Sequence, residues 1–432
     1  RCLTSGLFTP LMDERRLWSH WTYPEFLAAD FVKQRQLTPR QIEKLIFSSE
    51  EITGEMGRVV PQLAETAAWI AMMDRRLLGR VIRFDPQVLL RSQVVTADYE
   101  SKRQLVDALL CAAESDRFTS RLVRPGDYHV LDHPGLSDQL VPWIEDASRN
   151  LESRRVALNI VEGAATEKCE DVVRAVLFDT TESSLLRRKA LDAWLTLVPN
   201  ERRTDLRLLL DDLESDEDDE LRGKLLEILW PIHLSSEEMF RYITIPKNEK
   251  LLGIYAMFLW KSLLERLPDT DLPVAIKWLQ DQPLRDDPIR RFEQLETGIL
   301  ERAVLMCEQA PVFEALASLA CYWVFNEELA SRRDFHQFVS GPIRNRPEIR
   351  FRLLDRLVSF AATNAIVASE KWEIRSLFHP SELDGVLDGF ESATTDGELV
   401  SWANLANFGI YHADISTKNR FLTLREDNTI FR

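Results

Sequence analysis

The chain has 432 residues, of which 45% are hydrophobic, so it is long enough for two or three domains with their own cores. Its 70 acidic residues outnumber its 54 basic ones, and the net charge of −16 opposes binding to nucleic-acid phosphates and to anionic lipid. Glycine occurs only 15 times, about half the usual share of roughly 7%, while residues that favour helices are abundant. These numbers predict an all-α protein with neither nucleic acid nor a membrane as its partner.

The five cysteines are scattered and form no C-x-x-C pair, so the sequence encodes neither a disulfide framework nor a thiolate zinc site. The longest apolar run, residues 251–260, is about half the roughly 20 residues that cross a bilayer. We therefore expect a cytoplasmic protein. Because the chain begins at Arg1 without an initiator methionine or a signal peptide, we also expect it to be a piece of a longer protein.

The most specific motif lies in the first segment, residues 1–97. Residues 17–29 read L-W-S-H-W-T-Y-P-E-F-L-A-A. This stretch resembles the F-x-H-x-[ST]-[FY]-x-E-[FY]-[LF]-A-A signature of STAND NTPases of the NACHT type. The resemblance implies that residues 1–97 hold the end of a winged-helix domain, with a strand near Phe8, followed by a helical segment of the same module.

The local sequence independently predicts a helix that starts at Tyr23. Thr22 and Glu25 have the spacing of a capping box, and Pro24 falls in the first turn, where a missing N–H is harmless. Phe26, Leu27 and Phe31 would then form the apolar face of this helix.

The resemblance implies that His20, which matches the motif histidine, donates a hydrogen bond to the β-phosphate of ADP and holds an inactive state. Exchange of ADP for ATP would then release the winged helix. The alternative is that His20 only closes the turn. No G-x-x-x-x-G-K-[ST] motif occurs in the chain, so ADP or ATP is expected only in the parent protein, and we identify no catalytic centre here.

Residues 98–135 are predicted to form a helical connector. His129, Asp132 and His133 have metal-ligand side chains with an i, i+4 histidine spacing. Proline–glycine pairs on both sides favour a loop instead, so we predict no metal site.

Residues 136–330 contain an internal repeat. The stretch from Arg154 matches the stretch from Arg187 at an offset of 33, and a third copy begins at Leu221. Each copy reads as a pair of helices, and stacked pairs would bury a shared core, which predicts a HEAT-like α-solenoid. Tetratricopeptide and ankyrin signatures are absent. After Pro231 the helices continue without the spacing, and irregular helical packing stays an alternative there. The acidic stretch 211–220 is predicted to be a solvated turn between repeats.

Residues 331–411 are predicted to form C-terminal helices that are rich in arginine and interleaved with phenylalanine. That composition is typical of protein-binding surfaces, although nearby acids also permit an internally paired face. We predict partner contacts from Arg344, Arg346, Arg350 and Arg352. Residues 412–432 are predicted to be a tail or the start of another element, with a strand at 421–425.

Taken with the resemblance, these features suggest the helical sensor arm of a NACHT-type NTPase. Such an arm would recognise a foreign protein target, from a phage or pathogen, and would release an ADP-locked core to form a homo-oligomer. The alternative function is a freestanding α-solenoid scaffold without a nucleotide switch.

Overall fold

The computed structural model describes residues 6–10, 16–20, 22–49, 56–91, 98–118, 120, 123–214, 216–247, 252–281, 292–325, 335–364, 366, 368, 371–379 and 382–427. Helices make up most of this part of the chain, and the strands within it are four short ones, so the predicted all-α class is confirmed. The chain divides into two compact units, residues 1–217 (unit 1) and residues 218–432 (unit 2). The division falls inside the segment 136–330, for which the sequence predicts one run of repeats.

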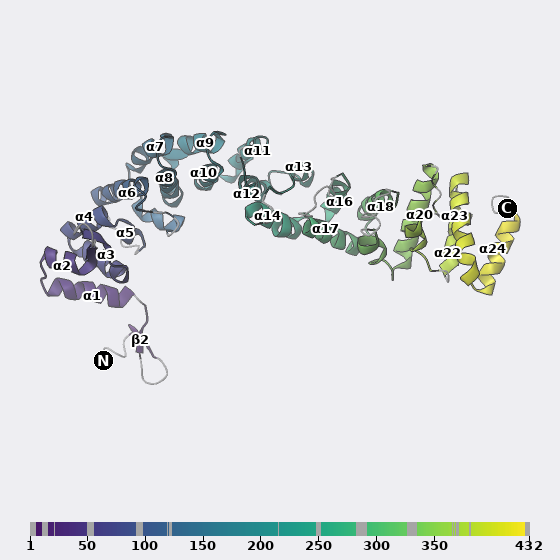
Figure 1. The fold of residues 1–432 in the computed structure, drawn as a ribbon, viewed down its shortest axis with the longest axis horizontal. Helices are drawn as coiled ribbons and strands as arrows, with labels where there is room; N and C mark the ends of the chain where they lie inside the picture. Colours follow the sequence, from purple (N-terminus) through teal and green to yellow (C-terminus); the bar gives the residue numbers. More distant parts are fainter. Residues whose placement is uncertain are drawn as a thin grey trace. The chain divides into compact units, whose positions relative to one another are not determined.

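Unit 1 begins with two small hairpins around two helices. Figure 1 labels one strand of the first hairpin and both helices. Strand β1 (Phe8–Pro10) pairs antiparallel with β2 (Arg16–Trp18), and β3 (Phe47–Ser49) pairs antiparallel with β4 (Met56–Val59). The strand at Phe8 was predicted from the motif, whereas the β3–β4 hairpin was not predicted. Helices α1 (Thr22–Gln34) and α2 (Pro39–Ile46) lie between the hairpins. The short η3 (Pro61–Leu63) leads into α3 (Ala64–Met73), which is followed by α4 (Arg75–Phe84) and α5 (Gln87–Arg91).

The rest of unit 1 is a two-layered array of helices. One layer contains α6 (Tyr99–Glu114), α8 (Leu151–Ala164) and α10 (Ser184–Leu197), which contact one another in that order. The other contains α7 (Leu136–Glu145) and α9 (Glu170–Phe178), which also contact each other. Short 3₁₀ turns join them: η5 (Pro125–Leu131), η6 (Glu167–Cys169) and η7 (Asn200–Leu206), the last running into α11 (Arg207–Leu210). The two layers bury a shared core in which Trp194 is fully enclosed.

A buried arginine recurs at the offset of 33 residues. The guanidinium of Arg154 donates to the carbonyl oxygen of Ile144, at the end of α7, at 3.0 and 3.2 Å. Arg187, at the matching position, donates to Leu177 near the end of α9 at 3.1 Å. The last carbonyls of a helix have no partner within the helix. Each arginine therefore caps one helix of its pair from the other helix.

Unit 2 also has two layers (Figure 1). In one, α12 (Glu220–Leu229) contacts α14 (Ile254–Met257) and η8 (Phe258–Ser262), which continue through α15 (Leu263–Arg266) to contacts with α17 (Glu293–Leu305) and η11 (Phe335–Ser340). In the other, α13 (Ser236–Arg241), α16 (Leu272–Asp281), α18 (Ala310–Phe325), α20 (Pro347–Thr363) and α23 (Asp396–Gly409) contact one another in sequence. The remaining elements are η9 (Asp269–Asp271), α21 (Trp372–Arg375), α22 (Leu383–Ser392), η14 (Ile410–His412) and α24 (Ile415–Asp427).

A regular spacing persists in unit 2 but is longer than in unit 1. Helices α13, α16, α18 and α20 begin at residues 236, 272, 310 and 347, which are 36 to 38 residues apart. Arginines again tie neighbouring helices together: Arg266 donates to Glu227 O at 3.1 Å, Arg302 to Leu264 O at 3.3 Å, and Arg346 to Val304 O at 2.9 Å. The period therefore does not end at Pro231 but changes length.

The prediction of a strand at residues 421–425 was wrong, because α24 covers this segment. Phe421 is buried while its neighbour Leu422 is half-exposed, as expected of a helix that rests on α22. Among the described residues, no helix is both long enough and apolar enough to cross a bilayer.

Candidate functional site

His20 forms an exposed corner just before α1. Its Nδ1 lies 2.8 Å from Thr22 Oγ1 and accepts the backbone N–H of Thr22 at 3.3 Å. Because a backbone N–H can only donate, the neutral ring carries its proton on Nε2. Among the described residues, no protein group takes up this Nε2–H. The two contacts with Thr22 therefore orient the imidazole through its Nδ1.

This geometry corrects the predicted capping box. The hydroxyl of Thr22 contacts His20 rather than the backbone of Glu25, and α1 already begins at Thr22. Glu25 instead lies in a partly desolvated position, where burial and the charge of Glu65 raise the pKa of its carboxyl, while His20 acts in the opposite direction. The motif therefore brings an imidazole and a carboxyl into one electrostatic environment.

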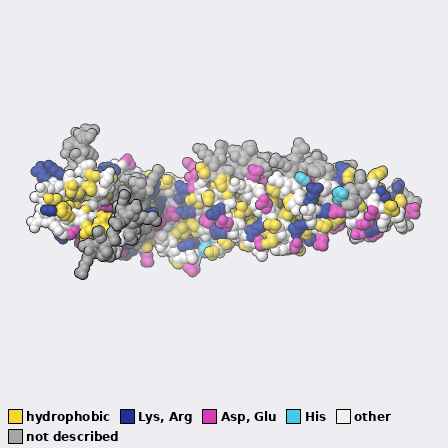
Figure 2. All heavy atoms as spheres, turned by 90° about the horizontal axis from the view of Figure 1, so that it is seen from below, with side chains coloured by type: hydrophobic (Ala, Val, Ile, Leu, Met, Phe, Trp, Pro, Cys, Tyr) yellow, Lys and Arg dark blue, Asp and Glu magenta, His cyan; other side chains and the backbone are white. Residues whose placement is uncertain are grey.

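The apolar face predicted for α1 exists, but only one of its three residues packs inward: the ring of Phe26 lies edge-on against Trp69 of α3, with 5.2 Å between the ring centroids. Ala29 and Val32 are buried where α1 packs on α3. Tyr23, Leu27 and Phe31, at i, i+4 and i+8, form an outward stripe and are 38%, 44% and 54% exposed. Figure 2 shows exposed hydrophobic side chains gathered at the left-hand end of the view, where the first helices lie. An apolar stripe of this kind on a surface helix is typical of a protein-binding site.

Two of the four arginines predicted to contact a partner are engaged inside unit 2. Arg350 is 8% exposed and donates to Leu377 O at 2.7 Å and to both carboxylate oxygens of Glu382. Besides the backbone carbonyl of Val304, the Arg346 guanidinium contacts Cys307 Sγ and the carboxylate of Glu308. These two side chains hold neighbouring helices together, which matches the alternative of an internally paired face.

The other two arginines are exposed. Arg352 stacks over Phe313 at 3.9 Å from the ring centroid, and Arg344 lies in the turn after η11. The partner-binding prediction therefore stays with Arg344 and Arg352. Arg332 and Arg333, of the same cluster, lie outside the described residues.

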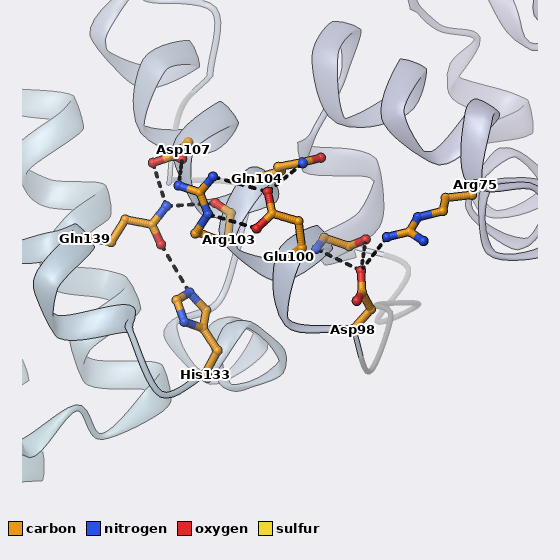
Figure 3. Close-up of polar contacts among 9 residues, drawn as sticks. Arg75, Asp98, Glu100, Arg103, Gln104, Asp107, His133 and Gln139 are labelled. Carbon is orange, nitrogen blue, oxygen red and sulfur yellow. Dashed lines mark hydrogen bonds and ion pairs between the residues drawn. The ribbon is translucent and has the colours of Figure 1, made fainter.

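A polar network joins α6 to α7 (Figure 3). Asp98 caps α6 by accepting the N–H and hydroxyl of Ser101, which lowers the pKa of the Asp98 carboxyl. Further along α6, Asp107 accepts Nε2 of Gln139 at 2.5 Å, and the oxygen of Gln139 lies 3.1 Å from His133 Nε2. The network is a structural connection between these helices.

His133 lies in this network, where its Nε2 is 3.1 Å from Gln139 Oε1. It is 7% exposed, its ring packs edge-on against Tyr99 at 5.1 Å, and its Nδ1 has no hydrogen-bond partner. His129 contacts Gly126 O instead. No group of three His, Cys, Asp or Glu side chains that would hold a metal occurs in the described residues.

Acidification is expected to destabilise unit 1 through His133. Burial lowers the pKa of this imidazole, so between its folded value and the unfolded value near 6.5 the unfolded chain binds more protons. Stability is therefore full above about pH 6.5 and falls as the pH drops through the folded pKa. Urea unfolding of wild-type and His133→Gln chains at pH 7.5 and 5.5 checks this: wild type should lose more stability than the variant. An equal loss in both would contradict the assignment.

The acidic stretch 211–220 was predicted to be solvated, and for two of its residues this was wrong. Asp216 and Asp219 are 0% and 1% exposed. Asp216 accepts the hydroxyl of Ser184 at 2.9 Å, and Asp219 accepts the backbone N–H of Lys247 at 2.7 Å. Both acids thus hold the ends of helices in place within their own units.

Sequence reasoning missed one cavity, in unit 1. It measures about 380 Å³ and is lined by Arg58, Arg83, Arg117 and Asp85 together with apolar side chains. The three arginines are spread over 60 positions of the chain and belong to different elements, so no local motif marked them.

Comparison with known proteins found no matching family model, no matching curated protein and no matching solved structure. The fold and the surfaces described above therefore carry the functional argument alone.

Proposed function

We propose that the chain is the helical sensor arm of a NACHT-type STAND NTPase. In this proposal His20 donates to the β-phosphate of ADP in the nucleotide-binding core of the parent protein. The helical arrays recognise a foreign protein target and thereby release the ADP-locked state for oligomerisation. The observation that carries the proposal is the corner at His20, where a ring whose Nε2–H meets no acceptor among the described residues adjoins the exposed apolar stripe of α1.

The two surfaces support the proposal together. The stripe formed by Tyr23, Leu27 and Phe31 supplies apolar area for a protein domain, and His20 at its N-terminal end supplies a hydrogen-bond donor. A hairpin, a pair of helices and a second hairpin in the order β1–β2, α1, α2, β3–β4 are compatible with the end of a winged-helix domain. The layered helices that follow favour a HEAT-like solenoid, because such helices contact only their neighbours.

Replacement of His20 by alanine in the parent protein tests this function. Loss of a hydrogen bond to a charged group costs about 1.5 kcal/mol or more, so ADP retained through purification should fall roughly tenfold while basal activity rises. His129→Ala, which alters another exposed histidine of unit 1, is the matched control and should change neither quantity. Unchanged ADP retention and basal activity in His20→Ala would reduce His20 to a turn residue.

The second candidate function is a protein-binding scaffold without a nucleotide switch. It is favoured by the absence of a P-loop motif from these 432 residues and by the exposed Arg344 and Arg352 in unit 2. The two candidates differ in the parent protein: a scaffold would retain no ADP in wild type.

A further inference from the structure

We propose that the cavity between β4, the end of α4 and the end of α6 binds a phosphate ester carried on an apolar group. This site is independent of the proposed nucleotide switch, because neither His20 nor the stripe of α1 lines it. Its volume of about 380 Å³ lies within the range of roughly 300–1,000 Å³ found for small-molecule sites.

The positively charged side chains around the cavity favour an anionic ligand. Arg58, Arg83 and Arg117 line it, and Asp85 is the one acid among the lining residues. Within the described part of the chain, none of the three guanidinium groups has a carboxylate partner. The lining therefore has a net charge of about +2 in a protein whose overall charge is −16. A phosphate monoester carries a charge of about −1.5 to −2 at neutral pH, and guanidinium groups bind its oxygens in a bidentate manner.

Two hydrogen bonds join the elements that surround the cavity, and neither of them pairs an arginine with a carboxylate. The side chain of Asp85, at the end of α4, accepts the backbone N–H of Val59 in β4 at 3.1 Å. Arg58, also in β4, donates one N–H to the carbonyl of Arg117, after α6, at 2.6 Å. The three elements are thus joined to one another, and no described residue accepts a hydrogen bond from the side chains of Arg83 and Arg117.

The remaining lining is apolar. Phe84, Phe118 and Ala112 contribute side chains, and the guanidinium of Arg83 lies 5.6 Å from the centroid of the Phe84 ring. Arginine donors next to an aromatic wall fit a ligand with a phosphate at one end and an aromatic or aliphatic body at the other. Such a group occurs on a free small molecule or on a phosphotyrosine side chain.

Calorimetric titration of the whole chain with phenyl phosphate tests the site, with phenol and inorganic phosphate as partial ligands. Phenyl phosphate should bind at least tenfold more tightly than either one. Cys111 supplies a second readout, because it lines the cavity and is exposed, whereas Cys169, Cys307 and Cys321 are buried. Bound phenyl phosphate should slow the alkylation of Cys111 as followed by mass spectrometry.

Variants of the cavity arginines then distinguish binding at this site from non-specific electrostatic binding to the protein surface. Arg83→Gln and Arg117→Gln should each weaken phenyl phosphate binding at least tenfold, with unchanged thermal unfolding. Arg76→Gln, on the same helix as Arg83 but outside the cavity, should bind like wild type. Arg58 is left intact because it joins two elements. Binding that survives both cavity variants, or no binding at millimolar phenyl phosphate, would overturn the proposal. If a phosphotyrosine peptide binds more tightly than phenyl phosphate, the natural ligand is a phosphotyrosine side chain of a protein. If phenyl phosphate binds more tightly, the natural ligand is a free small molecule.

Discussion

Replacing Gly163 by alanine is expected to lower the free energy of unfolding of unit 1 by about 3 kcal/mol. Gly163 lies in α8, where this helix packs against η5. A Cβ at this position would overlap the carbonyl oxygen of Pro125 and would lie 2.8 Å from Tyr128 Cβ. Backbone atoms cannot rotate away as a flexible side chain can, so α8 and η5 would have to separate. Hydrogen exchange of peptides from α8, measured by mass spectrometry, reports the loss within unit 1 alone.

Gly79→Ala is the matched control for this prediction. Gly79 lies in α4 of the same unit, and a Cβ there would meet nothing within 4 Å. Alanine should therefore stabilise the helix by about 0.5–1 kcal/mol, because glycine loses more backbone entropy on folding. If both variants were stabilised equally, the close approach of α8 and η5 would be refuted.

Removing the Arg187 side chain is expected to cost about 3–5 kcal/mol of stability in unit 1. Arg187 is fully buried and caps Leu177 O at the end of α9. Burial lowers the pKa of its guanidinium, and the charges of Asp212, Asp216 and Asp179 oppose that shift. In Arg187→Ala the carbonyl and the buried Asp216 lose a positive charge that offsets their burial, and a cavity remains.

Urea unfolding of Arg187→Ala, followed by circular dichroism, measures this loss. Arg76→Ala removes an exposed arginine from α4 and should change stability by no more than about 0.5 kcal/mol. An Arg187→Ala chain as stable as wild type would show that the repeated arginine is not a structural cap.

The helices were predictable where their sequences carry a full apolar stripe, as in α8 and α10, and where the repeat keeps one length. The longer spacing of α13, α16, α18 and α20 escaped notice because the loops between them vary, while packing fixes only the helices. The strand predicted at Phe421 failed because a short apolar alternation fits a helix equally well. In α1 the sequence pattern identified an apolar face, but only the packing of Ala29 and Val32 against α3 decides which face is buried.

The candidate sites also differ in how far the sequence alone could predict them. His20 was predictable because its motif is contiguous, and the pairing of its Nδ1 with Thr22 followed only from the structure. Arg350 was predicted as a surface contact, but its partner Glu382 lies 32 positions further along the chain. The arginine-lined cavity depends on three elements meeting, so its residues carry no signal until the chain is folded.

The arginine caps also bear on how the protein is made. Arg154 and Arg187 reach back 10 positions to their carbonyls, and Arg266, Arg302 and Arg346 reach back 38 to 42. At a synthesis rate of about 5–20 residues per second, the longest of these intervals is translated in roughly 2–8 seconds. The five helices capped in this way can therefore be completed within seconds of their synthesis, before the C-terminal helices have been made.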